Sequence, residues 1–313
     1  MTSSRQDASR RGATLITGCG SGIGAATAVT LAAAGHRVVA SVHSFHRMSE
    51  LAERSAEAGV ELDVRELDVT DAAATAACVA DVAAAYGSLR AVVSNAGVNR
   101  FDTFERETPE DYRRLFEVNV FGPVALIRQA MPFLRASGGR VVAVGSIGGV
   151  VGLPFQHAYS GSKFALEGVL ESLAPVARRL GVAVSVVEPG PTATGLGGIG
   201  DRERLDAESG PYREALRQYT ANAARVLPGL PSRQPADAVA AVIRDVLAAR
   251  DPDFRYATSP AGAAFLARKL PDVSGRATAD LIESWLEAPA EPRGTQFSRN
   301  ANPPNRPGSG PIT

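Results

Sequence analysis

The stretch Ala13-Thr-Leu-Ile-Thr-Gly-Cys-Gly-Ser-Gly-Ile-Gly24 joins an apolar run to a glycine-rich turn and leads into an alanine-rich segment. Glycines in such a turn let the backbone approach a ligand closely, and they aim amide N–H groups at a diphosphate where a helix starts. The spacing is Gly-x-x-x-Gly-x-Gly. Between a first strand and a first helix it predicts a dinucleotide site. We expect its contacts to come from Gly18, Ser21, Gly22, Ile23 and Gly24.

Short β-branched runs alternate with alanine-rich helical stretches from residue 13 to about residue 187. Strands are expected at 13–17, 37–42, 60–67, 90–94, 140–145 and 182–187, and helices at 22–35, 46–58, 71–86, 110–136 and 158–180. The strands are nearly continuous apolar runs, which indicates a sheet covered on both faces. The pattern predicts an α/β fold with a doubly wound parallel sheet. Pro123 and Pro132 predict a bend or an early end in the helix at 110–136.

A glycine- and proline-rich stretch without regular patterning follows residue 187. Such a long excursion in a compact domain predicts a substrate lid, at about 190–232. A helix at about 235–250, a strand at 254–258 and a last helix at about 275–288 complete the expected single domain, 12–288. We expect residues 1–11 to be flexible. Residues 289–313 are rich in Pro, Gly, Asn and Arg and are expected to be a disordered tail.

The composition disfavours several kinds of partner. The chain has 313 residues, of which 33 are basic and 33 acidic, so neither a nucleic acid nor an anionic membrane surface is expected as a partner. No run approaches 18 apolar residues, so no membrane insertion is expected. The two cysteines predict neither a disulfide framework nor a metal site, and they fit a reducing, cytoplasmic location.

Tyr159 and Lys163 stand four residues apart in an expected helix, which places both side chains on one face. A free phenol ionises near pH 10, and a fixed ammonium beside it favours the phenolate and lowers its pKa. The pair is therefore a candidate proton-transfer device, with Tyr159 as the acid/base and Lys163 as its tuner.

Short polar groups follow the ends of two further strands. Ligands of open α/β sheets bind beyond the carboxyl ends of the strands, so these groups fit the adenine and ribose side of one crevice. Taken singly, either could be an ordinary turn, and the interpretation depends on the set. The residues are Asp68, Val69, Asn95, Ala96 and Gly97.

With these motifs in order, the chain resembles the short-chain dehydrogenase/reductase superfamily over about residues 12–260. The matching positions are Thr17–Gly24, Asp68, Asn95–Gly97, Asn119, Ser146, Tyr159, Lys163 and Pro189-Gly190. The phrases at 145–155 and 162–168 are similar to its hydroxysteroid and retinol dehydrogenase branch. The resemblance implies a Rossmann-type fold and an NAD(P)-dependent oxidoreductase that acts on CH–OH groups.

The resemblance also implies a role for each catalytic position. Tyr159 would exchange a proton with the substrate oxygen, and Ser146 would hydrogen-bond that oxygen as charge develops on it. Lys163 would tune Tyr159 and bind the nicotinamide ribose, and Asn119 would hold a water that links Lys163 to solvent. Glu188 has no role in this interpretation. Further cofactor contacts are implied at Pro189, Gly190 and Thr192.

The sequence around the expected active site is apolar, which predicts a bulky lipophilic alcohol or carbonyl substrate rather than a sugar. The apolar residues are Val150, Val151, Leu153, Pro154 and Phe155, with Leu196, Ile199 and Leu205 in the lid.

The resemblance implies a homodimer or homotetramer that pairs the helices at 110–136 and 158–180. Apolar residues beyond what one sheet face needs support this: Leu126, Ile127, Leu166, Val169 and Leu173.

The end of the second strand determines the expected cofactor. An acidic residue about 20 positions after the glycine-rich turn would select NAD. Here the expected position is Val42, and no carboxylate follows until Glu50. We expect a preference for NADP(H), with NAD(H) as the alternative. Groups that could donate to a 2′-phosphate are Ser41, His43, Ser44 and Arg47, although Ser44 and Arg47 could equally cap the next helix.

Two other functions stay open at this point. A catalytically silent NAD(P)-binding sensor would be expected to lack Ser146, Tyr159 or Lys163, and all three are present. A nucleotide-sugar epimerase or dehydratase would carry a larger C-terminal substrate domain, for which residues 188–288 leave little room. The residues therefore favour the oxidoreductase.

Overall fold

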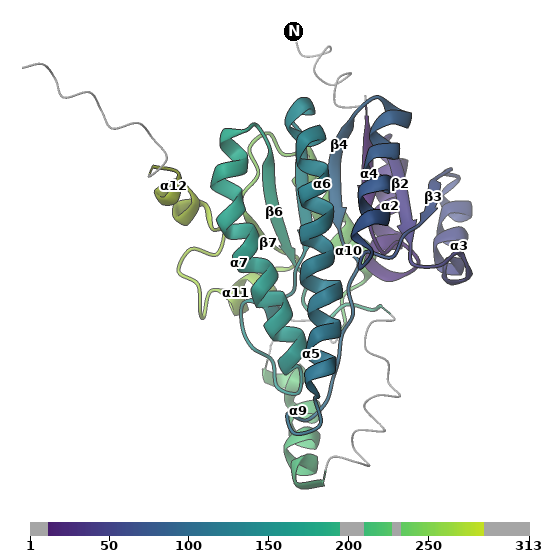
Figure 1. Cartoon of the computed structure of the whole chain (residues 1–313). Helices are drawn as coiled ribbons and strands as arrows, with labels where there is room; N and C mark the ends of the chain where they lie inside the picture. Colours follow the sequence, from purple (N-terminus) through teal and green to yellow (C-terminus); the bar gives the residue numbers. More distant parts are fainter. Residues whose placement is uncertain (1–11, 195–209, 227–232, 285–313) are drawn as a thin grey trace, which may run out of the picture.

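A computed structural model describes residues 12–194, 210–226 and 233–284. Within them, a seven-stranded parallel sheet has the order β3-β2-β1-β4-β5-β6-β7 (Figure 1). This confirms the doubly wound α/β fold. The strands are β1 (Ala13–Ile16), β2 (Arg37–Val42), β3 (Asp63–Glu66), β4 (Leu89–Ser94), β5 (Arg140–Val144), β6 (Ala183–Glu188) and β7 (Arg255–Ala257).

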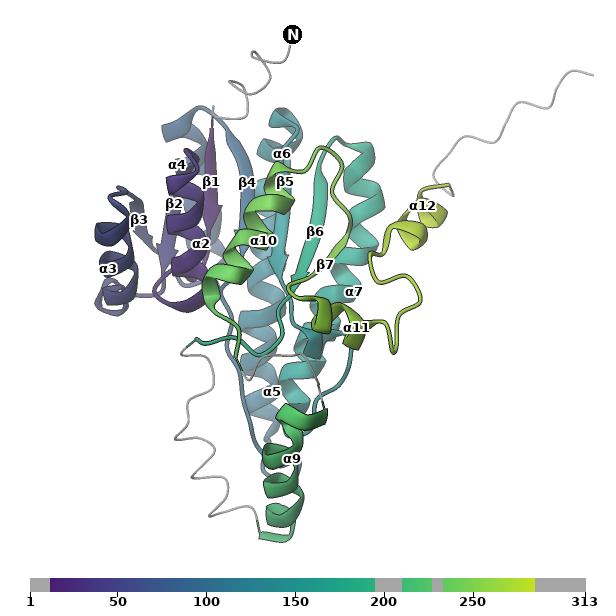
Figure 2. The same ribbon diagram turned by 180° about the vertical axis from the view of Figure 1, so that it is seen from behind.

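Helices cover both faces of the sheet, as the continuous apolar strands predict. Figure 1 shows α4, α6 and α7 over one face, and Figure 2 shows α2 and α10 over the other. The helices are α2 (Gly22–Ala33), α3 (Ser49–Ala58), α4 (Ala72–Tyr86), α5 (Pro109–Phe116), α6 (Gly122–Ser137), α7 (His157–Arg179), α9 (Arg213–Val226), α10 (Ala236–Ala248), α11 (Pro260–Leu266) and α12 (Arg276–Ser284).

One apolar layer between the sheet and α4, α6 and α7 contains residues that the sequence assigned to a subunit interface. Leu126, Ile127 and Leu166 are 1%, 4% and 2% exposed and pack in this layer. Their assignment was wrong, because these side chains point at the sheet and not away from it. Leu173 packs against the same layer, whereas Val169 is 42% exposed.

The single helix expected at 110–136 is interrupted. A π-helical turn, Glu117–Phe121, separates α5 from α6, and Asn119 lies within it. Pro123 stands in the first turn of α6, directly after the π-helical turn, where a proline is tolerated. Pro132 lies inside α6, which continues to Ser137. The expected bend is therefore a change of helix type before the first proline.

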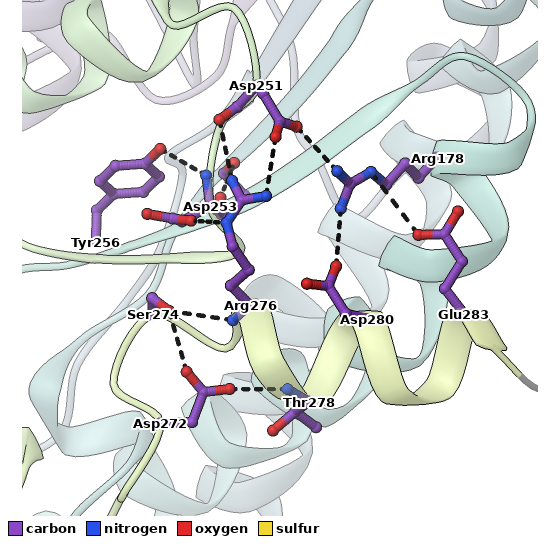
Figure 3. A network of polar contacts seen from close by, with 11 residues as sticks. Arg178, Asp251, Asp253, Tyr256, Asp272, Ser274, Arg276, Thr278, Asp280 and Glu283 are labelled. Carbon is purple, nitrogen blue, oxygen red and sulfur yellow. Dashed lines mark hydrogen bonds and ion pairs between the residues drawn. The ribbon is translucent and has the colours of Figure 1, made fainter.

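The C-terminal part contains one helix that was not expected. Ion pairs also join its last helix to α7. The short helix α11, which the sequence did not predict, starts at a Ser259 cap. Helix α12 lies against α7, where Arg178 pairs with Asp251 and Asp280 at 3.0 and 3.5 Å (Figure 3). Arg276 joins the same network through Asp251 at 2.9 Å.

Candidate active site

The expected site residues gather at the carboxyl edge of the sheet. Gly18 follows β1, Asn95 follows β4 and Ser146 follows β5, while Glu188 ends β6. In a parallel sheet these ends share one edge, which is where ligands bind. Helix α9 lies beyond this edge (Figure 1).

The glycine-rich turn has the shape that its spacing predicts. Gly18 and Gly22 have φ of +72° and +58°, in the region that favours glycine. A Cβ on Gly24 would lie 2.2 Å from the Gly18 carbonyl oxygen, so a side chain cannot fit there. The turn therefore brings its backbone close to whatever lies over it.

Thr17 and Asn95 hold this turn in place. The Thr17 hydroxyl accepts from the Asn95 N–H at 3.1 Å and from the Ala96 N–H at 3.2 Å. The Asn95 amide donates to the carbonyls of Thr17 and Gly18 at 2.9 and 3.0 Å. Asn95 thus shapes the turn itself, and Thr17 is a supporting residue that the sequence did not single out for this role.

The start of α2 fits a bound diphosphate. Ser21 is the N-cap residue but its side chain makes no capping hydrogen bond, and the first turn of α2 contains no acidic residue. A carboxylate does reach the turn from another helix, because the Gly22 N–H donates to Glu50 Oε2 at 3.2 Å. The backbone of residues 18–24 is therefore suited to hold the pyrophosphate of a nicotinamide cofactor.

The end of β2 differs from the expectation at two positions. Val42 is fully buried in the core, so its side chain cannot be the one that meets an adenosine ribose. Ser41 is 1% exposed and its hydroxyl has no hydrogen-bond partner within the described residues, so it does not face a ligand either. His43 is the exposed residue at this strand end, with its side chain 68% exposed.

Three carboxylates surround this corner, which the sequence order did not reveal. Asp68 Oδ2 lies 3.6 Å from His43 Nε2, and hydrogen bonds from Thr70 lower the pKa of the Asp68 carboxyl. Glu66 accepts from the Phe45 N–H at 3.1 Å, and Glu50 reaches the glycine-rich turn. The expectation that no carboxylate lies near a 2′-phosphate was therefore wrong.

Ser44 and Arg47 follow His43 in a 3₁₀ turn, Phe45–Arg47. The Ser44 hydroxyl accepts from the His46 N–H at 3.4 Å and caps this turn, which is the alternative role predicted for it. Arg47 is exposed.

Ser146, Tyr159 and Lys163 come together in one buried site. Their exposures are 9%, 7% and 6%. The Ser146 hydroxyl is within hydrogen-bonding reach of the Tyr159 hydroxyl, and it also accepts from the Gly148 N–H at 3.0 Å. Lys163 Nζ lies 5.9 Å from the centre of the Tyr159 ring. A phenol, a hydroxyl and an ammonium are the groups that proton transfer to a carbonyl oxygen requires.

Burial dominates the electrostatics of this site. It raises the pKa of Tyr159 to about 12, while the hydrogen bond from Ser146 acts in the opposite direction. Burial also lowers the pKa of Lys163 to about 8. Desolvation of the phenolate and the charge of Glu188 therefore raise the pKa by more than the Ser146 hydrogen bond lowers it, a direction opposite to the lowering expected from Lys163.

Asn119 is fully buried, and its amide group is used within the protein. Its Oδ1 accepts from the Val98 N–H at 2.9 Å, and its Nδ2 donates to the Val98 carbonyl at 2.9 Å and to the Ser162 hydroxyl at 3.0 Å. A Cβ on Gly97 would lie 3.3 Å from Asn119 Oδ1 and 3.8 Å from Lys163 Nζ. Gly97 therefore lies beside both side chains. The water-holding role of Asn119 stays a prediction.

The segment after β6 closes over the glycine-rich turn. The Pro189 carbonyl accepts from the Ile147 N–H at 3.1 Å, and Thr192 donates to the Gly190 carbonyl at 2.9 Å. Gln234, buried and not predicted, binds Thr192 Oγ1 at 3.2 Å. Thr194 would contact a Cβ placed on Gly22 at 2.8 Å. Leu196, Ile199 and Leu205 lie outside the described residues, as does much of the predicted lid.

Phe155, four residues before Tyr159, belongs to an aromatic cluster. Phe155 packs with Phe101 and Leu216, and its ring centroid is 5.7 Å from that of Tyr219 on α9. Phe155 has φ of +61°, unusual for a residue with a side chain. Val150 belongs instead to a separate cluster with Ile147 and Leu266, so it is core.

His157 and Glu107 form a pair at the start of α7. The Glu107 carboxylate, fully buried, lies 3.2 Å from His157 Nδ1 and accepts from the Ala158 N–H at 3.2 Å. Tyr112 donates to the same carboxylate at 3.1 Å. His157 is therefore a contact at the start of this helix. Glu107 was missed because it stands 50 residues away in the sequence.

Residues 13–202 match the family model described as short chain dehydrogenase. The chain belongs to this family. Human 17-beta-hydroxysteroid dehydrogenase type 1 is 34% identical to it over 83% of this chain and 81% of the relative. Retinol dehydrogenase 8 from Bos taurus is 34% identical over 83% of this chain and 86% of the relative. These relatives confirm the predicted branch.

A comparison with solved structures agrees with this family assignment. A short-chain dehydrogenase from Streptomyces avermitilis superposes with a TM-score of 0.66 at 31% identity, covering 88% of this chain and 97% of that one. This family member is therefore an NAD(P)-dependent oxidoreductase that interconverts alcohols and carbonyl compounds. In the part of the chain that the structure describes, no helix has the length and hydropathy of a membrane span.

Proposed function

We propose that this dehydrogenase uses NADP(H) to interconvert a primary or secondary alcohol and an aldehyde or ketone on a bulky lipophilic substrate. Two observations carry the proposal: the buried Ser146–Tyr159–Lys163 site, and an aromatic cluster that includes Phe155, four residues before Tyr159. Apolar walls with a few polar groups orient a large hydrophobic body.

The three side chains divide the proton chemistry between them. In the reducing direction the Tyr159 hydroxyl gives its proton to the substrate oxygen, and Ser146 hydrogen-bonds that oxygen as negative charge develops on it. Lys163 stabilises the phenolate that results and binds the nicotinamide ribose. When bound, the nicotinamide supplies or takes up the hydride. Backbone groups of residues 18–24 and 189–192 hold the cofactor over this site.

The lipophilic substrate class rests on the aromatic residues and on the relatives. The ring centroids of Phe101, Phe155 and Tyr219 lie 5.7 to 6.3 Å from one another. The relatives named above are a hydroxysteroid dehydrogenase and a retinol dehydrogenase, whose names describe rigid or elongated apolar alcohols. A sugar would leave such a wall poorly matched, because its hydroxyls would lose water without gaining partners.

The NADP(H) preference rests on the end of β2. The last residue of β2 is the buried Val42, which is not acidic. His43 and Arg47 follow it and are exposed. Asp68, Glu66 and Glu50 oppose a 2′-phosphate at this corner, so the proposed preference depends on hydrogen bonds or positive charge from His43 and Arg47.

One screen tests both parts of the proposal. NAD(P)H absorbance is followed while both cofactors are crossed with steroids, retinoids, aliphatic ketones and polyols, with Tyr159→Phe as the inactive control. We expect the highest kcat/KM for a steroid or retinoid with NADP(H). A higher kcat/KM for a polyol overturns the substrate class, and an equal or higher kcat/KM with NAD(H) overturns the cofactor choice.

A further inference from the structure

Glu188, the last residue of β6, is fully buried directly behind the catalytic serine. Its Oε2 accepts from the N–H of Ser146. Gly145 makes room for it, because a Cβ there would lie 2.5 Å from Glu188 Oε1. The side chain therefore contacts the backbone that carries Ser146, and any residue larger than glycine at 145 would displace it.

A second buried carboxyl group, that of Glu167, is 9% exposed and lies within hydrogen-bonding reach of the Glu188 carboxyl group. Glu167 stands one turn after Lys163 on the same face of α7. Its Oε1 accepts from Arg255 Nε at 2.6 Å, and Arg255 on β7 is 5% exposed. Glu171 stands one turn further along α7, and its Oε1 lies 3.4 Å from Nη2 of the same guanidinium.

Each of the two buried carboxyl groups has one paired and one unpaired oxygen. Glu188 Oε1 and Glu167 Oε2 are buried and have no hydrogen-bond partner among the described residues. Ionised carboxylates only accept hydrogen bonds, so two of them in contact leave these oxygens unsatisfied and repel each other. A single proton placed between them removes both costs, as in other pairs of close carboxyl groups.

The surrounding charges favour placing that proton on Glu188. Arg255 forms an ion pair with Glu167, whereas Glu188 has no ion pair among the described residues. Burial raises the pKa of Glu188 well above its usual range, and contact with Glu167 raises it further, while the Ser146 N–H and Arg255 act in the opposite direction. Among the described residues, Lys163 and Tyr159 are further titratable groups on which the charge of Glu188 acts.

We propose that Glu188 is a positioning residue of the active site, held as a neutral carboxylic acid whose O–H donates a hydrogen bond to Glu167 and whose other oxygen accepts from the Ser146 N–H and fixes that backbone. The inference deepens the proposed function and rests on it for the role of Ser146. A neutral Glu188 leaves the charge of Lys163 free to act on Tyr159. An ionised Glu188 would raise the pKa of both groups and so disfavour the phenolate.

The protonation state is tested without any reference to activity. Infrared spectra of the purified protein at neutral pH should contain the carbonyl band of a protonated carboxyl group. This band should disappear in Glu188→Gln and persist in Glu171→Gln, the matched control on the same arginine. A spectrum of the unmodified protein without a band that Glu188→Gln removes overturns the neutral state, whatever the enzyme's substrate is.

The positioning role is tested by a kinetic series with the preferred substrate. Glu188→Gln keeps an oxygen for the Ser146 N–H and an N–H for Glu167, so kcat and the midpoint of its pH profile should stay at the values of the unmodified enzyme. Glu188→Leu leaves the Ser146 N–H without its partner, and kcat should fall about 10- to 100-fold with little change in KM. Glu171→Gln should change neither constant.

Two kinetic results overturn the inference. One is an unchanged kcat in Glu188→Leu, and the other is a pH profile that moves to lower pH in Glu188→Gln. Should Glu188→Leu fail to fold, the infrared band and the Glu188→Gln profile still decide. Loss of turnover in Tyr159→Phe tests the proposed function separately, so failure of one proposal is distinguishable from failure of the other.

Discussion

Lys163 Nζ donates a 2.9 Å hydrogen bond to the carbonyl oxygen of Val144, the last residue of β5. This bond places the ammonium between the sheet edge and the Tyr159 ring. It also gives the charge one backbone partner in a buried environment, where an ammonium without partners would be costly. The catalytic lysine is therefore anchored by the strand that leads into Ser146.

Tyr159→Phe removes the proton donor while keeping the ring that packs beside Leu115 and Ala158. We expect kcat/KM to fall by roughly 10²–10⁴-fold. Cofactor affinity, measured by NADPH fluorescence titration, should change little. Near-normal turnover of the variant would exclude the proton-transfer role.

The stability contribution of Lys163 should depend on pH. Burial lowers its pKa from 10.5 to about 8, so between these values the folded protein binds fewer protons here than the unfolded chain. The contribution of this lysine to the free energy of unfolding therefore rises as pH rises through that window. Lys163→Met lacks this titration, and its stability relative to the unmodified protein should fall by up to about 3 kcal/mol across the window.

Urea denaturation at several pH values measures this difference, with Lys269→Met, which changes the chain's other lysine, as the matched control. Tyr159 changes the free energy of unfolding in the opposite direction, because its pKa is raised from 10.0 to about 12. Its effect begins only at about pH 10. A difference between Lys163→Met and the unmodified protein that is constant from pH 8 to pH 10 would contradict the burial argument.

Cofactor selectivity should respond to His43 rather than to Val42. A carboxylate at 43 would face a 2′-phosphate, so His43→Asp should lower kcat/KM for NADPH about tenfold or more relative to NADH. His43→Arg should act in the opposite direction. Steady-state rates with both cofactors measure the ratio, and His46→Asp on the adjacent 3₁₀ turn is the control. A ratio unchanged in His43→Asp would remove His43 from the selectivity site.

Association should use the exposed apolar residues of α7 and of the turn before α6. Phe121, Phe164, Val169, Val176 and Leu180 are between 36% and 55% exposed. We expect a homodimer or homotetramer, and Val169→Glu should shift it toward the monomer in sedimentation at micromolar concentration. Phe45→Glu, at a residue that is 51% exposed on another surface, should not. A monomeric unmodified protein would count against this interface.

The sequence predicted the order of strands and helices because each element carries its own signal. Apolar runs identified the strands of residues 13–187, and the glycine-rich turn marked the dinucleotide site. The exact limits were less accurate, since β3 covers only 63–66 of the expected 60–67. Helix α11 was missed because its seven residues are too few to show a periodic pattern.

The sequence pattern did not predict the orientation of single side chains. Val42 is the last residue of β2 and is buried, whereas His43 follows the strand and is exposed. The apolar pattern predicts the strand but not the exposure of the residues at its end. Leu126 and Leu166 lie on long helices whose inner and outer faces are both apolar in places. Glu188, Glu167 and Arg255 come from three elements, so no local spacing connects them.

The π-helical turn at 117–121 has a consequence for insertions and deletions. Removing one residue there would let α5 and α6 run on as one regular helix, but each residue of an α-helix advances by about 100°. The two segments would rotate against each other by that amount. Either Asn119 would leave Val98 and Ser162, or the face of α6 that carries Leu126 would turn from the sheet to solvent. This segment should therefore tolerate substitutions far better than a change of length.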